Sequence, residues 1–90
     1  MSTAARRIAD DVCMRAILSI LAFAPGQTLP IRRIQQELDD NHGQSVTTER
    51  LGALCVRMAD MGLIQHQNGL AKLAEPGRDV VFGRTELPGA

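Results

Sequence analysis

The amino-acid sequence predicts a single, mainly helical domain with one small β-hairpin. Its 90 residues suffice for one domain but not for two. Apolar residues recur with helical spacing in three separate segments, and an Asn-Gly pair divides two short strand-like runs near the C-terminal end. The core must be built from aliphatic side chains, because the chain contains two Phe residues and neither Trp nor Tyr.

The first predicted helix covers residues 5–23 and ends before Pro25-Gly26. Its core-facing stripe has the i, i+3, i+4, i+7 spacing of an amphipathic helix and consists of Met14, Ile17, Leu18 and Leu21. A second apolar stripe lies beside the first, and a helix with two apolar faces is usually covered on both. We therefore predict a homodimer whose interface is this second stripe: Ile8, Val12, Ala16, Ile20 and Phe23.

A short extended segment at residues 28–30 leads into a second helix, predicted over residues 30–40. Pro30 is expected in its first turn, where a missing N–H costs nothing. The apolar stripe of this helix consists of Ile31, Ile34 and Leu38.

The third predicted helix covers residues 47–61. Thr47 is a favoured N-cap residue, and Gly62 suits the left-handed position that follows a helix. The buried stripe consists of Leu51, Leu54, Cys55, Met58 and Met61.

The clearest local signal is the hairpin predicted over residues 63–73. Asn68-Gly69 lies between two short strand-like runs, and this pair is preferred in the type I′ turn of a two-residue hairpin. A short helix is predicted over residues 77–83, followed by an irregular tail at residues 84–90.

The predicted order is helix, short strand, helix, helix, hairpin and short helix, which is the order of a winged helix-turn-helix domain. Residues 1–90 form this single domain. The second and third helices make the helix-turn-helix, and the hairpin is the wing.

Four passages resemble known families. Residues 51–64, which end in Met-Ala-Asp-Met-Gly-Leu-Ile, resemble the recognition-helix-to-wing passage of winged-helix transcriptional regulators. Residues 73–81 resemble the passage after the wing, with Ala74 in place of the usual Thr. Ala-Pro-Gly at residues 24–26 and Gly-Arg…Leu-Pro-Gly at residues 83–89 resemble a family of small ArsR-like-labelled proteins of Mu-like bacteriophages and prophages. The resemblance implies a winged-helix fold and a role in phage gene regulation.

In a winged helix the N-terminal half of the third helix enters the major groove of double-stranded DNA. Threonine and arginine can contact phosphates or base edges there. We predict DNA contacts on the third helix, the second helix and the hairpin, from Thr47, Thr48, Arg50, Arg57, Arg32, Arg33, His66 and Lys72.

An interaction with protein is the alternative. Ten acidic and ten basic residues give zero formal net charge, whereas a DNA-binding domain usually carries a basic surplus. Gly52 and Ala53 of the third helix also lack side chains long enough to contact a base. The first helix could instead bind a phage or host protein, or a second copy of the chain. In a homodimer the phosphate contacts would be doubled, which favours DNA binding.

The sequence contains no pattern typical of catalysis, a cofactor or a metal. His42 and His66 belong to no nucleophile or metal motif, and no glycine-rich phosphate loop is present. Leu54-Cys55-Val56 is similar to the metal-sensing box of ArsR proteins, but the position of its second cysteine holds Arg57. We predict a protein that is not an enzyme, takes no cofactor and keeps Cys13 and Cys55 as reduced core thiols.

We expect a cytoplasmic protein. The apolar run at residues 16–24 is too short to span a bilayer. Asp10 and Asp11 separate this run from the preceding arginines, which is unfavourable for a secretory signal.

Overall fold

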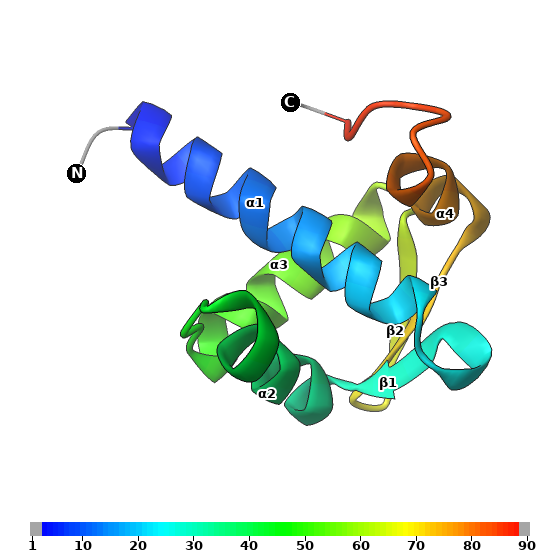
Figure 1. The fold of residues 1–90 in the computed structure, drawn as a ribbon, viewed down its shortest axis with the longest axis horizontal. Coiled ribbons are helices and arrows are strands. Elements are labelled where there is room, and N and C mark those ends of the chain that lie inside the picture. The colour runs from blue at the N-terminus through cyan, green and yellow to red at the C-terminus, as the bar shows by residue number, and fades with distance from the viewer. Residues whose placement is uncertain (1–2, 89–90) are drawn as a thin grey trace.

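The elements follow one another in the order predicted from the sequence. The structure is a computed structural model that describes residues 3–88, with side chains described for residues 9–88. Within this range it contains four α-helices, one short 3-10 turn and three strands (Figure 1). They are α1 (Thr3–Ala22), η1 (Pro25–Gln27), β1 (Thr28–Pro30), α2 (Ile31–His42), α3 (Thr48–Asp60), β2 (Ile64–Gln67), β3 (Leu70–Leu73) and α4 (Glu75–Val81).

Two proline positions account for the main differences from the predicted bounds. Pro30 is the last residue of β1 and the N-cap of α2, so it precedes the first turn of that helix. The last helix was predicted to begin at residue 77 after a turn, but α4 begins at Glu75. Pro76 lies in its first turn, where proline is tolerated because no helical hydrogen bond needs its nitrogen.

The three strands form one antiparallel sheet in the order β1-β3-β2. Asn68 and Gly69 connect β2 to β3, with φ angles of 54° and 74°. Positive φ at both central residues is what a type I′ turn requires, so the predicted hairpin turn is confirmed. Lys72 of β3 lies opposite Thr28 of β1 on one side and Gln65 of β2 on the other.

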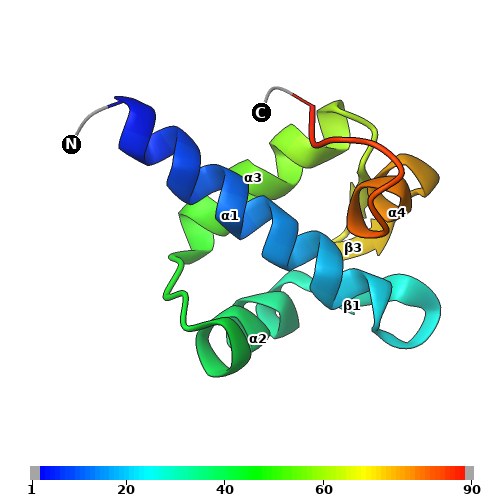
Figure 2. The ribbon, with the colours of Figure 1, turned by 45° about the horizontal axis from the view of Figure 1, so that its top comes forward.

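The core is aliphatic and centres on α1. Figures 1 and 2 show α1 crossing α3, with α2 and α4 on opposite sides of it. No polar or charged residue is buried among the side chains that the structure describes. The side chains that are wholly shielded from solvent include Cys13, Ile17, Leu18, Leu21, Ile34, Leu38, Leu51, Cys55 and Met58.

The predicted second apolar face of α1 is covered by the chain itself only in part. Ala16 is buried in the core, and Ile20 is half-buried and packs against it. The reason is that α1 contacts α2, α3, β3 and α4, which together cover a broad arc of its surface. Val12 and Phe23 remain exposed, while the side chain of Ile8 lies outside the described part of the chain. Ala16 is therefore unavailable to a dimer interface, whereas a homodimer through the exposed residues of this stripe stays a prediction.

The predicted irregular tail is anchored to the domain. Leu87 is buried in the core, and Arg84 forms an ion pair with Asp79 of α4. None of the helices in the described range is both long enough and apolar enough to cross a membrane.

Candidate nucleic-acid interface

The N-terminal end of α3 is exposed and capped as predicted. The backbone N–H of Arg50 donates to Oγ1 of Thr47 at 3.1 Å. Glu49 lies in the first turn, where its negative charge is favourable for the helix dipole. Thr47 and Thr48 are both exposed at this end.

Thr47→Ala is expected to lower the free energy of unfolding by about 1 kcal/mol, because the Arg50 amide loses its side-chain acceptor. Thr85→Ala is the control, since it truncates the same residue type at an exposed position and leaves the cap intact. It is expected to change the free energy of unfolding by no more than about 0.5 kcal/mol. Urea unfolding measures both, and equal effects would contradict the capping role.

A side chain of α2 holds the connection between α2 and α3. Nε2 of Gln35 donates to the carbonyl of Val46 at 2.8 Å and lies 3.3 Å from Oγ1 of Thr48. Gly43 ends α2 with a φ of 64°, a left-handed conformation that glycine adopts without steric cost. Gln35 was not singled out from the sequence, because an amide on the wet side of a helix carries no signal of such a contact.

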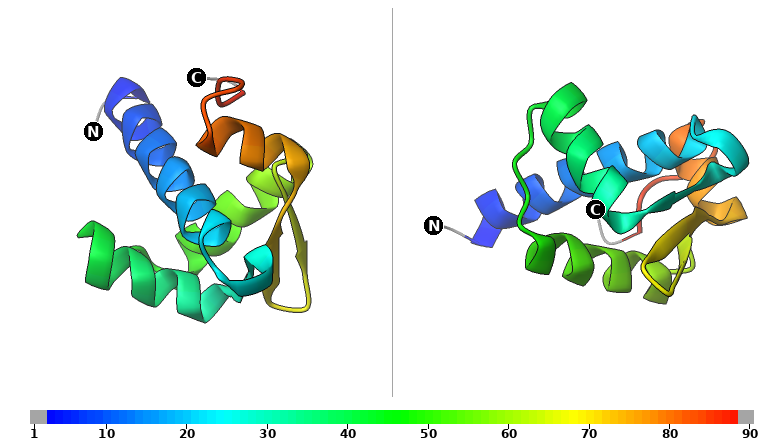
Figure 3. Two further views of the ribbon diagram at one scale, coloured as in Figure 1. Left: turned by 45° about the vertical axis from the view of Figure 1, so that its right-hand side comes forward. Right: turned by 90° about the horizontal axis from the view of Figure 1, so that it is seen from below.

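An open hollow of about 700 Å³ lies along α2 and extends from the N-terminal end of α3 to the hairpin turn. The backbone N–H of Ile31, the first residue of α2, donates to the carbonyl of Gly69 at 2.9 Å and fixes the hairpin turn against the helix. Figure 3 shows these three elements from two further sides. The hollow is lined by Pro30, Ile31, Arg32, Arg33, Gln35, Gln36, Thr48 and Gly69.

The predicted cationic residues of α2 and the hairpin differ in how they are held. Arg33 forms an ion pair with Glu37 at 3.1 Å. Arg32 and Lys72 are exposed, and neither has an ion pair or a side-chain hydrogen bond within the described residues. Arg32 and Lys72 are therefore available to an anionic partner.

His66 does not share a face with Lys72. His66 lies opposite Ala71, which is wholly buried, whereas Lys72 lies opposite Gln65, which is exposed. Successive residues of a strand point to opposite faces of a sheet, so half-buried His66 is on the inner face and Lys72 on the outer one. His66 and Lys72, both predicted as DNA contacts of the hairpin, therefore lie on opposite faces of the sheet, and their contacts with DNA stay predictions.

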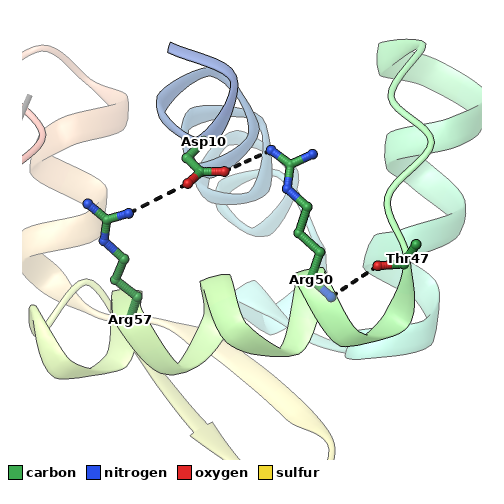
Figure 4. Close-up of polar contacts among 4 residues, drawn as sticks. All are labelled: Asp10, Thr47, Arg50 and Arg57. Atoms are coloured by element: carbon green, nitrogen blue, oxygen red, sulfur yellow. Dashed lines mark hydrogen bonds and ion pairs between the residues drawn. The ribbon is translucent and has the colours of Figure 1, made fainter. Parts of the chain in front are cut away.

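The two predicted arginines of α3 are both held by one carboxylate of α1. Nη2 of Arg50 lies 2.8 Å from Oδ1 of Asp10, and Nη1 of Arg57 lies 3.8 Å from Oδ2 of the same residue. Figure 4 shows both guanidinium groups pointing from α3 toward α1. They therefore lie on the flank of α3 that faces α1.

The outward row of α3 carries no cation. Leu51, Cys55 and Met58 face the core, and with about 3.6 residues per turn the opposite row holds exposed acidic and small apolar residues. That row consists of Glu49, Ala53, Val56 and Asp60. Direct attraction of phosphate by the middle of α3 is therefore unfavourable.

The two cysteines are buried, as predicted for core thiols. Burial raises the pKa of Cys55 to about 11, and it also raises the pKa of Cys13, where Arg50 opposes the shift. Within the described range, no three His, Cys, Asp or Glu residues lie close enough together to hold a metal ion.

Neither thiol is expected to react with a disulfide reagent in the folded protein at about pH 8. The thiolate is the reactive form, and burial both disfavours it and blocks access. Unfolding in urea should make both thiols react within the same time. Rapid reaction of Cys55 in the folded state would contradict its placement in the core.

Comparison of the chain with protein-family models, curated proteins and solved structures found no match. Function must therefore be inferred from the side chains themselves and from the way the fold places them.

Proposed function

We propose that this chain is a winged helix-turn-helix domain that binds double-stranded DNA. The topology supports this assignment, since α2 and α3 are joined by a short turn and the hairpin β2–β3 pairs with β1 in one sheet. The resemblance to phage proteins makes transcriptional regulation in a phage or prophage the proposed role.

The observation that carries the proposal is the open hollow along α2, which extends from the N-terminus of α3 to the hairpin turn and includes Arg32, an arginine without an ion pair among the described residues. The dipole of a helix N-terminus and its unpaired N–H groups attract anions such as phosphate. The N–H groups of Ile31 and Arg50 already donate to Gly69 and Thr47, so the other N–H groups of the two first turns are the candidates.

Arg32 and Thr48 line the hollow, and so does Gly69 of the turn. Lys72 adds a second free cation on the outer face of the neighbouring sheet.

This arrangement favours contact with the phosphate backbone over reading of bases. Phosphate contacts supply most of the affinity and position the protein, but they carry no sequence information. On the outward row of α3, Glu49 could accept a hydrogen bond from a cytosine amine, while Ala53 and Val56 offer only apolar contact. We therefore propose salt-dependent binding with modest sequence preference.

A fluorescence anisotropy titration with duplex DNA at about 50 and 200 mM salt tests the proposal, because phosphate-mediated binding weakens steeply over this range. Arg32→Ala and Lys72→Ala are each expected to weaken binding and to lower the slope of log affinity against log salt by about 1. Arg84→Ala is the control, since it removes the same charge from a residue that pairs with Asp79 and does not line the hollow.

Two outcomes would contradict the proposal. One is that wild-type protein fails to bind duplex DNA at the lower salt. The other is that all three variants weaken binding alike, which would mean that only total charge matters and the hollow has no role.

One observation favours protein binding as a second candidate. Phe23 and Phe82, the two aromatic residues of the chain, are 76% and 53% exposed and contact each other edge to face, with ring centroids 6.5 Å apart. The guanidinium of Arg84 lies 5.6 Å from the ring centre of Phe82. Exposed aromatic residues next to arginine are enriched at protein interfaces.

Phe23→Ala separates the two candidates. If the Phe23–Phe82 pair binds a second copy of the chain, light scattering should give a dimer for the wild type and a monomer for the variant. If DNA binding through the hollow is the function, Phe23→Ala should leave the DNA affinity unchanged, because Phe23 is not among the residues that line the hollow.

A further inference from the structure

Asp10 is placed to hold two arginines that belong to a different helix. Its carboxylate offers one oxygen to Arg50 and the other to Arg57, at 2.8 and 3.8 Å. The side chain of Asp10 is 20% exposed, while those of Arg50 and Arg57 are 41% and 51% exposed. The acid is thus set back between α1 and α3, and the two guanidinium groups cover it from the solvent side.

Arg50 and Arg57 lie on the opposite flank of α3 from the hollow. They are about two helical turns apart, so they project from the same side of the helix, toward α1. Thr48 projects from the other side, toward Gln35 of α2. A helix in the major groove runs between two phosphate strands, so each flank of α3 would face one of them.

We propose that Asp10 takes the place of a DNA phosphate on the α1 flank of α3 and thereby restrains the DNA affinity of the domain. Carboxylate and phosphate are interchangeable partners for a guanidinium group, since both accept charge-assisted hydrogen bonds through paired oxygens. While Asp10 holds Arg50 and Arg57, it neutralises one of their two charges and so weakens the attraction of this flank for phosphate. This inference rests on the proposed function.

Asp10→Asn tests the inference, because it removes the charge that holds the arginines and keeps the shape of the side chain. Asp11→Asn is the matched control: it changes the net charge equally on the same helix but releases only Arg15 of α1. Each freed arginine that neutralises a phosphate steepens the slope of log affinity against log salt concentration by about 0.9. Asp10 neutralises one of the two guanidinium charges, so its removal uncovers one charge and should raise the ratio of affinities at about 50 and 200 mM salt about 3.5-fold over wild type.

The double change Arg50→Ala/Arg57→Ala is then made both in the wild type and in Asp10→Asn, and the titration is repeated. It distinguishes release of the two arginines from a general effect of net charge. In the wild type this double change should lower the salt slope by about 0.9, because Asp10 already neutralises one of the two charges. In the Asp10→Asn background it should lower the slope by about twice as much, because both charges are then free. Additive electrostatics would instead give the same change of slope in both backgrounds, which would overturn the inference. Thermal unfolding of each variant verifies that it is folded.

The two proposals can fail separately. Equal slopes for Asp10→Asn and Asp11→Asn, with binding by the wild type, would overturn the inference and leave the proposed function standing. Absence of duplex binding by both the wild type and Asp10→Asn at the lower salt would overturn the proposed function and the inference with it. Binding by Asp10→Asn alone would overturn the proposed function, because the wild type would not bind, and would leave only the inference that Asp10 restrains Arg50 and Arg57.

Discussion

Gly77→Ala is expected to lower the free energy of unfolding by about 1 to 3 kcal/mol, the usual cost of forcing extra volume into a packed site. Gly77 is buried in the first turn of α4. A Cβ atom there would collide with the carbonyl oxygen of Leu63 and lie 2.8 Å from Cδ1 of Leu73. That oxygen cannot withdraw cheaply, because it accepts a 3.0 Å hydrogen bond from the N–H of Ala74.

Gly52→Ala is the matched control, and the opposite sign is expected. Gly52 lies inside α3 without a positive φ, and no atom lies within 4 Å of where its Cβ would be. Replacing a glycine in a helix interior by alanine should raise the free energy of unfolding by about 0.5 to 1 kcal/mol. Urea unfolding measures both variants. A Gly77→Ala protein as stable as Gly52→Ala would contradict the close packing of α4 against Leu63.

Leu38→Ala is expected to cost about 2.5 to 5 kcal/mol of unfolding free energy, since it removes a wholly buried side chain and leaves a cavity. Ile34 and Leu38 are the two buried residues of α2, so this helix depends on them for its position. A loss of this size is a large fraction of the roughly 5 to 15 kcal/mol that stabilises a typical domain. Arg32 would be displaced with the helix, and the salt-dependent DNA binding should fall too.

Leu70→Ala makes the same truncation at a leucine that is 44% exposed on the hairpin. Its expected cost is below about 1 kcal/mol, because much of the side chain is already in contact with water. Calorimetric melting of the two variants gives the comparison. Similar melting temperatures would mean that α2 is not held by its buried stripe.

Features with a local cause could be predicted from the sequence. The Asn68-Gly69 turn needs only two residues that accept positive φ, and the caps at Thr47 and Gly62 depend on chemistry within one helical turn. The buried stripes of α2 and α3 follow from spacing alone. The start of α4 was missed, because proline in Glu75-Pro76-Gly77 marks a turn and a first helical turn equally well.

Features that depend on how elements pack could not be predicted in this way. Asp10 and Arg50 are 40 positions apart, and nothing local indicates that α1 crosses α3 where these side chains meet. The covering of α1 by both α2 and α4 likewise follows from the assembled fold. The placement of His66 and Lys72 on opposite faces of the sheet, by contrast, could have been predicted from the sequence. A two-residue turn at Asn68-Gly69 pairs His66 with Ala71, and alternation then separates it from Lys72.

The central claim is that DNA binds at the hollow that lies along α2 and extends from the N-terminus of α3 to the hairpin turn. The most direct measurement is a nuclear magnetic resonance titration of the nitrogen-15-labelled protein with a short DNA duplex at about 50 mM salt, where phosphate contacts are strong. The claim predicts that amide shifts concentrate at Arg32, Thr48, Gly69 and Lys72 while the amides of Phe23 and Phe82 stay unchanged. An unaltered spectrum, or shifts confined to the surroundings of Phe23 and Phe82, would contradict it.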